Sequence, residues 1–370
     1  MVTGAVVAQW LLQATSTIGR VVGISLLTLV PGELGGSETY ARELLRALGR
    51  SGELDYRVLL PPAAPAVDGG LPSEVAAEYL EARTIPRRLA AMTLATARPG
   101  RLRRRLRDAT VVHYPLTLRI PTVPQPSATT LLDLQHLDLP ALFSRQERAF
   151  RAVAWHRSVR GADRVIVISE FVRDRAIALL GLDSERIRVI HLGIDHDLFR
   201  PGADEREPFL LYPARPWPHK NHARLYEAFA LLRRERPGLR LVLTGGGHLS
   251  RLPDGVETAG LVSVEELAGL YRRAAAVVFP SLYEGFGQPP LEAMACGCPV
   301  ACSDAASLPE VVGDAARLFD PHDPRGIADA VRDVLDSPGE WSARGLVQAG
   351  RFSWDAVARA NDAVYRELGA

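Results

Sequence analysis

The stretch Pro208-Phe-Leu-Leu-Tyr-Pro-Ala-Arg-Pro-Trp-Pro-His-Lys-Asn-His222 decides the fold of the second half of this chain. Its first five residues form an apolar run of strand length, and apolar residues with a helical period follow from Asn221 to Arg234. Lys220 therefore falls where the carboxyl end of a strand turns into a helix. Ligands bind at that edge of open α/β sheets, and a helix amino terminus offers unpaired N–H groups to an anion.

Lys220 is the only lysine in the sequence, although lysine and arginine together number 44. Arginine presents a wide planar fork, whereas lysine presents a compact charge on a flexible stem that can reach one phosphate oxygen. Arg215 lies on the same predicted loop. A lysine retained by chance on a helix surface is one interpretation, and a pair of cations that clamps a phosphate is the other. The position at a strand end favours the phosphate clamp.

Strand and helix patterns alternate along both halves of the chain, which is typical of parallel sheets wrapped by helices. Strand patterns cover residues 21–30, 56–60, 111–113, 129–132, 164–168, 209–212, 239–243, 276–279 and 299–301, and helical patterns include 37–48, 141–159 and 354–368. The segment 195–206 has no apolar periodicity and is the predicted linker. We predict an α/β protein with an extension at 1–20, Rossmann-like doubly wound domains at 21–196 and 197–350, and a final helix within 351–370, capped by Ser353. Two such domains facing each other would enclose a ligand cleft between their strand ends.

Composition excludes some classes of function. A net charge of +1 argues against nucleic-acid binding. Arginines nevertheless crowd the stretch 87–107, at positions Arg87, Arg88, Arg98, Arg101, Arg103, Arg104, Arg105 and Arg107. Either this stretch is a solvated helix and loop, or it meets acidic substrates or anionic lipid at the periphery of a membrane.

Neither the leading segment nor the cysteines indicate secretion. Residues 1–19 lack a basic leader and are too polar for a signal peptide or a membrane span. The three cysteines, Cys296, Cys298 and Cys302, have no zinc-site spacing and are predicted to pack in the core. A cytoplasmic protein is expected.

Two glycine-rich stretches are candidates for anion binding. Gly35 and Gly36 follow the first predicted strand and precede a helix, where either a plain tight turn or a phosphate loop fits. The second stretch, Ser281-Leu-Tyr-Glu-Gly-Phe-Gly-Gln-Pro-Pro-Leu-Glu292, places one carboxylate on a glycine loop and another eight residues later. Its glycines free N–H groups for an anion, and Glu284 and Glu292 can accept hydrogen bonds from sugar hydroxyls. Acid near a helix amino terminus would explain Glu292 alone, but not the glycines before it.

Taken together, these motifs resemble retaining glycosyltransferases of family 4, which have the GT-B fold. The resemblance covers residues 21–370 and is carried by Gly35-Gly36-Ser-Glu, Val167-Ile-Ser-Glu-Phe, His191-Leu-Gly-Ile-Asp, Arg215 with Lys220, Gly245-Gly-Gly, Gly260-Leu-Val, and Glu284 to Glu292. It implies a nucleotide diphosphate sugar as donor, no further cofactor and no metal. The first domain would bind the acceptor, notably through residues 61–107, and the acceptor hydroxyl would belong to a glycan, a lipid-linked molecule or a small molecule.

The resemblance also assigns roles to single residues. Arg215 and Lys220 would bind the donor diphosphate, Glu284 the transferred sugar and Glu292 the ribose hydroxyls. Arg215, Lys220 and Glu284 would be the catalytic residues. The remaining donor-binding residues implied are Gly35, Gly36, Gly260, Leu261, Val262, Gly285, Phe286 and Gly287.

One position departs from the family pattern. Leu132 stands where similar proteins carry a histidine beside the hydroxymethyl group of the donor sugar, although Asp133 remains. His136 either turns back toward the donor or is a buried structural histidine. The substitution predicts a 6-deoxy sugar or pentose donor. A sugar phosphorylase, a nucleotide-sugar epimerase and a catalytically silent nucleotide-sugar binding protein are the alternatives to a retaining transferase.

Overall fold

The computed structural model describes residues 20–32, 35–81, 84–247 and 251–370, so residues 1–19 of the predicted extension lie outside it. Within these residues one sheet has seven strands in the order β3-β2-β1-β4-β5-β6-β7. Its strands are β1 Val21–Ser25, β2 Asp55–Leu60, β3 Ser73–Val75, β4 Val111–Tyr114, β5 Ser127–Leu131, β6 Arg164–Val167 and β7 Ile187–Val189. The ladders β3–β2, β2–β1, β1–β4, β4–β5 and β6–β7 are all parallel.

Helices connect these strands as the alternating pattern predicts. They are α2 Gly36–Ser51, α3 Ile85–Ala97, α4 Gly100–Arg105, α5 Gln135–Asp138, α6 Arg145–Gly161 and α7 Glu170–Leu180. The helix α2 buries one apolar face, including Leu44 and Leu48, and exposes the opposite one. Ser169 caps the amino end of α7, where its side chain accepts a hydrogen bond from the Val172 N–H, and Gly181 follows the last helical residue in the left-handed conformation.

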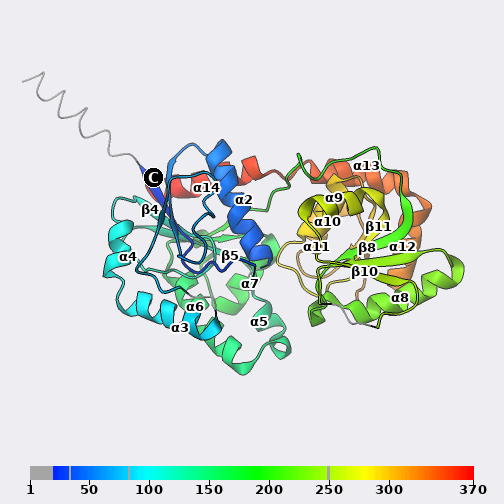
Figure 1. Cartoon of the computed structure of the whole chain (residues 1–370), viewed down its shortest axis with the longest axis horizontal. Coiled ribbons are helices and arrows are strands. Elements are labelled where there is room, and N and C mark those ends of the chain that lie inside the picture. The colour runs from blue at the N-terminus through cyan, green and yellow to red at the C-terminus, as the bar shows by residue number, and fades with distance from the viewer. Residues whose placement is uncertain (1–19, 33–34, 82–83, 248–250) are drawn as a thin grey trace, which may run out of the picture. The chain divides into compact units, whose positions relative to one another are not determined.

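The second sheet has six strands among the described residues, in the order β10-β9-β8-β11-β12-β13. Its strands are β8 Glu207–Pro213, β9 Arg240–Thr244, β10 Val256–Gly260, β11 Ala274–Phe279, β12 Val300–Ser303 and β13 Arg317–Phe319. The intervening helices are α8 His222–Glu235, α9 Val264–Arg273, α10 Gln288–Ala295, α11 Leu308–Val312, α12 Pro324–Asp336 and α13 Pro338–Ala349. The strands are parallel, and α12 packs against both α8 and this sheet (Figure 1). All carboxyl ends therefore lie along one edge.

The chain forms two compact units. The first comprises the described residues up to Thr130 together with Gly161–Arg164 and Ala358–Ala370, and the second comprises Leu131–Arg160 and Val165–Val357. The domain boundaries given above from the sequence stay a prediction.

The last helix, α14 Trp354–Glu367, carries the chain back to the first unit. Ser353 accepts a hydrogen bond from the Ala356 N–H, as its predicted capping role requires. Further along, the hydroxyl of Tyr365 lies 2.7 Å from Nδ1 of the buried His113, and the Tyr56 hydroxyl donates to Asp362. These buried contacts hold the carboxyl end of the chain on the first sheet's unit.

Two predicted elements differ from the structure by four residues or more at one end. The first strand stops at Ser25, because a turn closed by the Leu29 N–H and the Leu26 carbonyl follows it, although residues 21–30 are predicted as strand. The helix predicted for 141–159 begins only at Arg145. Ser144 and Glu147 exchange side-chain and backbone hydrogen bonds there and so fix the helix start.

Candidate functional site

The loop that carries Lys220 is fixed at the carboxyl end of β8. Residues Pro218–Lys220 form a 3₁₀ turn, and Asn221 then takes a left-handed conformation with φ of 59° before α8 begins. The Asn221 side chain donates to the carbonyl oxygens of Pro280 and Pro321, at 3.1 and 2.7 Å. The hydroxyl of the buried Tyr212 donates to the Lys220 carbonyl. Lys220 is therefore presented from a rigid support at the strand edge.

Lys220 and Glu284 form an ion pair. The Lys220 Nζ lies 2.6 Å from Glu284 Oε1, and the two side chains are only 13% and 15% exposed. The same Nζ lies 5.3 Å from the centre of the Phe279 ring, at the end of β11. The strands β8 and β11 are neighbours in the sheet. The loops that follow their carboxyl ends therefore meet, although they are far apart in sequence. The structure thus brings together two of the three predicted catalytic residues.

Arg215, the third predicted catalytic residue, lies on the same loop but is exposed. Its guanidinium carbon is 5.8 Å from the centre of the Trp217 ring. An exposed arginine beside a partly buried lysine gives this edge one fixed cation and one that solvent and ligands can reach.

Serine hydroxyls hold the backbone of the Glu284 loop. Ser307 Oγ donates to the carbonyl oxygens of Glu284 and Phe286, at 3.0 and 2.7 Å, and Ser169 Oγ donates to that of Gly285 at 2.8 Å. Gly285 is required because a Cβ there would lie 2.3 Å from the Leu132 carbonyl oxygen. Three successive carbonyl groups therefore point at protein donors. This arrangement fixes the peptide orientation of the loop that the sequence assigns to the donor.

Glu292 lies on α10, where its Oε2 accepts a hydrogen bond of 3.0 Å from the hydroxyl of the fully buried Tyr271. Burial raises the pKa of Glu292 to about 7, although the bond from Tyr271 opposes that rise. The carboxyl group is therefore poised to change its charge near neutral pH. A bound hydroxyl group would favour the ionised form.

The glycines after β9 bring three predicted motifs together. The Gly245 N–H donates to the Gly260 carbonyl at 2.9 Å, and a Cβ on Gly245 would lie 2.9 Å from the Arg215 backbone nitrogen. Gly246 lies beside the Leu261 side chain, which is 75% exposed. Val262 is partly exposed. An uncovered leucine at this edge offers an apolar surface to a ligand ring.

The remaining predicted glycines are placed as follows. Gly287 immediately precedes α10 with φ of 117°, next to the buried Phe286. Gly35 and Gly36 belong to the first unit, at the amino terminus of α2, and beyond their own chain segment no described atom lies within 4 Å of a Cβ built on either residue. Their backbone is open to a ligand, and their role in donor binding stays a prediction.

Glu310 connects segments that are far apart in the sequence, and none of the motifs described above includes it. Its carboxylate bonds His191 Nε2 at 2.7 Å and accepts the backbone N–H groups of Glu170 and Phe171 at 2.7 and 3.1 Å. Burial alone would raise the pKa of Glu310, but these bonds outweigh it and lower the pKa below its usual value. Glu310 joins the His191 and Ser169 motifs, and nothing in the local sequence indicates partners more than 100 residues away.

The segment around Leu132, where the sequence departs from the family pattern, packs against the Glu284 loop. The Leu134 N–H donates to the Tyr283 hydroxyl at 3.3 Å, and the Leu132 side chain is partly exposed. Burial raises the pKa of Asp133, opposed by Arg151 and the Gln135 N–H and reinforced by the charge of Glu284.

Of the two alternatives for His136, the structure shows the buried structural histidine. It is only 1% exposed, and its ring packs edge-on against Phe143 and Trp155 with centroids 6.3 and 5.5 Å away. Burial lowers the pKa of His136 to about 4, so the ring is neutral at physiological pH.

Other predictions concern cysteines, metals and membranes. All three cysteines are free and buried, as predicted, and burial raises the pKa of Cys296 and Cys298 to about 12. Within the described residues, no group of three or more His, Cys, Asp or Glu side chains is arranged to hold a metal ion. In the same part of the chain, no helix is long and apolar enough to cross a membrane.

Comparison with known proteins gives two family matches. Residues 34–198 match the model described as Glycosyltransferase Family 4, and residues 194–351 match the model described as Glycosyl transferases group 1. The D-inositol 3-phosphate glycosyltransferase of Mycolicibacterium smegmatis is 30% identical, over 87% of this chain and 84% of its own. The O-antigen chain mannosyltransferase B of Escherichia coli is 34% identical, over 62% of this chain and 67% of its own.

Among solved structures, Anabaena Alr3699/HepE in complex with UDP-glucose resembles this chain in fold. The TM-score is 0.69 at 17% identity, over 94% of this chain and 99% of that one.

Proposed function

The chain belongs to glycosyltransferase family 4 and has the GT-B fold, and we propose that it transfers a sugar from a nucleotide diphosphate sugar to an acceptor hydroxyl with retention at the anomeric carbon. The Lys220–Glu284 ion pair at the strand edge carries the proposal. As the glycosidic bond breaks, its electron pair passes to the diphosphate, which gains negative charge. A cation held in place with little contact with water stabilises that charge strongly.

Retention is proposed to proceed by attack on the face that the diphosphate leaves. The acceptor oxygen bonds to the anomeric carbon while the phosphate oxygen departs, and that phosphate oxygen takes the acceptor proton. Glu284 is engaged by Lys220 through Oε1, and its carboxylate is suited to accept hydrogen bonds from sugar hydroxyls. Two carboxyl groups acting as acid and nucleophile would instead indicate hydrolysis.

The nucleoside half of the donor is assigned to the edge beyond Arg215. Glu292 would accept hydrogen bonds from the ribose hydroxyls, and the backbone at Leu261 and Val262 would contact the base. The donor class is supported by the Anabaena protein of similar fold, which was solved with UDP-glucose. The acceptor hydroxyl is left open, because the relatives act on different acceptors.

A direct test begins with a thermal-shift screen of nucleotide sugars, since a ligand that binds the folded chain raises its stability. The stabilising donor is then incubated alone, with phosphate, and with a panel of hydroxyl acceptors, and the nucleoside diphosphate and sugar are analysed. We expect acceptor-dependent release of nucleoside diphosphate. An altered sugar on the intact nucleotide would establish an epimerase, phosphate-dependent formation of a sugar phosphate would establish a phosphorylase, and binding without turnover would establish a silent protein.

We further propose that the reaction needs no metal and occurs in the cytoplasm. Lys220 and Arg215 supply positive charge where a divalent ion would otherwise neutralise the phosphates. Turnover that survives dialysis against EDTA supports this assignment, and restoration by Mg²⁺ or Mn²⁺ of activity lost in EDTA would refute it.

The sugar is proposed to lack a hydroxyl at its sixth carbon. Leu132 gives the donor an apolar neighbour at the position of a hydrogen-bonding histidine, and an unpaired buried hydroxyl costs about 1–3 kcal/mol. Such a cost corresponds to roughly a 5- to 150-fold preference for the 6-deoxy donor over the hexose on the same nucleotide. Leu132→His should reduce or reverse that preference in kcat/KM. A preference for the hexose that the variant leaves unchanged would remove Leu132 from donor selection.

A further inference from the structure

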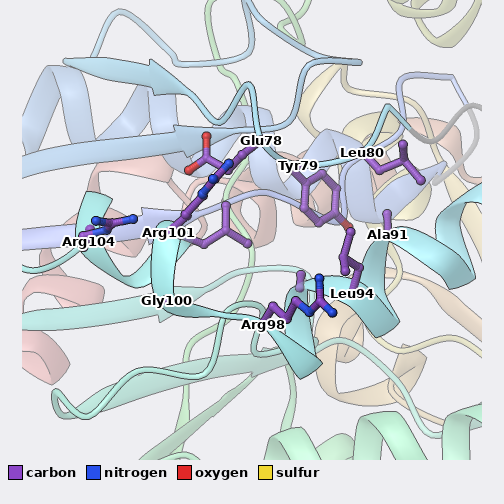
Figure 2. Close-up of a pocket in the computed structure, with 11 residues that line it drawn as sticks. Glu78, Tyr79, Leu80, Ala91, Leu94, Arg98, Gly100, Arg101 and Arg104 are labelled. Atoms are coloured by element: carbon purple, nitrogen blue, oxygen red, sulfur yellow. The ribbon is translucent and has the colours of Figure 1, made fainter.

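The first unit contains a pocket that the donor site does not use. It is a partly open hollow of about 680 Å³ between the segment Glu78–Leu80, which follows β3, and the helices α3 and α4 (Figure 2). Pockets of roughly 300–1,000 Å³ are typical of small-molecule sites. Because β3 is parallel to its neighbour, the pocket lies beyond a carboxyl strand end, where α/β proteins bind ligands.

One part of the lining is apolar. Tyr79, Ala91 and Leu102 are almost fully buried and belong to the hydrophobic core beneath the pocket. Leu80 and Leu94 also line it, but they are 45% and 47% exposed. Exposed leucines next to a pocket provide an apolar surface that a ligand chain can cover.

The other part of the lining is cationic. Arg98, Arg101 and Arg104 line the pocket and are exposed, and within the described residues no hydrogen bond or ion pair engages their guanidinium groups. Figure 2 shows Arg101 extending toward Glu78, and its charge lowers the pKa of that carboxyl group.

The neighbouring acid does not neutralise these arginines. Both carboxylate oxygens of Glu78 accept hydrogen bonds of 2.7 Å from Arg105, which is a different arginine and also pairs with Glu74. The pocket therefore keeps an excess of positive charge.

We propose that this pocket binds a lipid phosphate, that is, an amphiphile with a phosphate or diphosphate head and an unbranched or isoprenoid chain. Guanidinium groups of Arg98, Arg101 and Arg104 pair with the head, because their fork geometry matches phosphate oxygens. Tyr79, Leu80 and Leu94 contact the first part of the chain. A soluble phosphate would leave the leucines in water, and a neutral lipid would leave three arginines without a counterion. The proposal concerns the first unit alone and stands or falls separately from sugar transfer.

Titration calorimetry on the full chain tests it, with decyl phosphate below its micellar concentration as the probe. Inorganic phosphate and decyl maltoside supply the head and the chain separately. We expect saturable one-to-one binding of decyl phosphate that is at least about tenfold tighter than either comparison ligand. Arg101→Gln combined with Arg104→Gln should weaken it about tenfold or more. Leu94→Ser should weaken decyl phosphate without changing the response to inorganic phosphate.

Arg107→Gln is the matched control, because Arg107 lies on the same arginine-rich stretch, is 73% exposed and does not line the pocket. Its affinity for decyl phosphate should equal that of the wild type, and thermal unfolding confirms that each variant is folded. Equal weakening in Arg107→Gln would show unspecific charge attraction and overturn the proposal. So would equal affinities for inorganic and decyl phosphate, or binding to anionic phosphatidylglycerol vesicles without binding to the monomeric probe.

Discussion

Glu292 should make nucleotide binding depend on pH. Burial raises the pKa of its carboxyl group to about 7, and the bond from Tyr271 only partly opposes this. The carboxylate form accepts hydrogen bonds from ribose hydroxyls at both oxygens, whereas the protonated form has lost acceptor capacity. Under the proposed role, the nucleotide therefore binds best to the ionised form.

The size of the effect follows from that pKa. With a value near 7, about one tenth of Glu292 is ionised at pH 6 and about nine tenths at pH 8. Apparent affinity scales with the competent fraction, so nucleoside diphosphate should bind roughly tenfold more tightly at pH 8 than at pH 6.

As pH rises, the free energy of unfolding should fall while the affinity for the nucleotide rises. The native state holds this proton more strongly than the unfolded chain does, so the stabilisation is present below about pH 4.5 and is lost as pH rises to about 7. The upper limit of this loss is on the order of 3 kcal/mol.

Calorimetric titration with nucleoside diphosphate at pH 6, 7 and 8 measures the affinity. The phosphate groups of the ligand also titrate near this range, so the informative quantity is the difference between the wild type and Glu292→Gln. Glu292→Gln should lose the part of the pH dependence of affinity that is due to Glu292. Tyr271→Phe, which removes a bond that lowers the pKa of Glu292, should move the midpoint to higher pH. Identical pH profiles in the wild type and Glu292→Gln would refute the assignment of the titration to this residue.

Two further variants separate the roles of neighbouring groups. Glu284→Gln should lower kcat while leaving nucleoside diphosphate affinity within about threefold, whereas Glu292→Gln should chiefly weaken that affinity; equal losses of affinity would contradict the assignment. Ser307→Ala removes the donor to the Glu284 and Phe286 carbonyls and should cost about 1–3 kcal/mol of stability and on the order of tenfold in kcat. Ser144→Ala, which removes a helix cap elsewhere in the same unit, should cost about 1 kcal/mol without changing kcat. Equal effects of the two serine variants on kcat would show that Ser307 acts only through stability.

The sequence indicates the central strands well and the edge strands poorly. Strands β1, β8 and β11 are mostly apolar runs because both of their faces are buried, and β4 is a short buried run that includes His113. The four strands that lacked a sequence prediction, β3, β7, β10 and β13, are the outermost strands of the two sheets. In β10, the residues Glu257, Thr258 and Ala259 are exposed, so no apolar pattern marks it.

The sequence likewise identifies some residues of the site and not others. Glu284, Glu292 and Lys220 could be selected because their motifs combine charge, glycine and a strand end within a few residues. Ser307, Tyr271 and Glu310 support that site through contacts with groups 21 to 140 residues away. Only the folded chain shows these contacts, since each supporting residue is ordinary in its own segment.

In the proposed reaction, Lys220 stabilises the departing diphosphate of a sugar donor. The most direct test is the rate of acceptor-dependent nucleoside diphosphate release in the wild type, Lys220→Ala and Lys220→Arg, with folding checked by thermal unfolding. Loss of one fixed charge in a site shielded from water should reduce kcat on the order of 10²–10³-fold. Lys220→Arg should recover little of it, because a planar fork does not reproduce the compact charge that Lys220 places beside Glu284 and Phe279. Wild-type turnover in folded Lys220→Ala would contradict this role of Lys220.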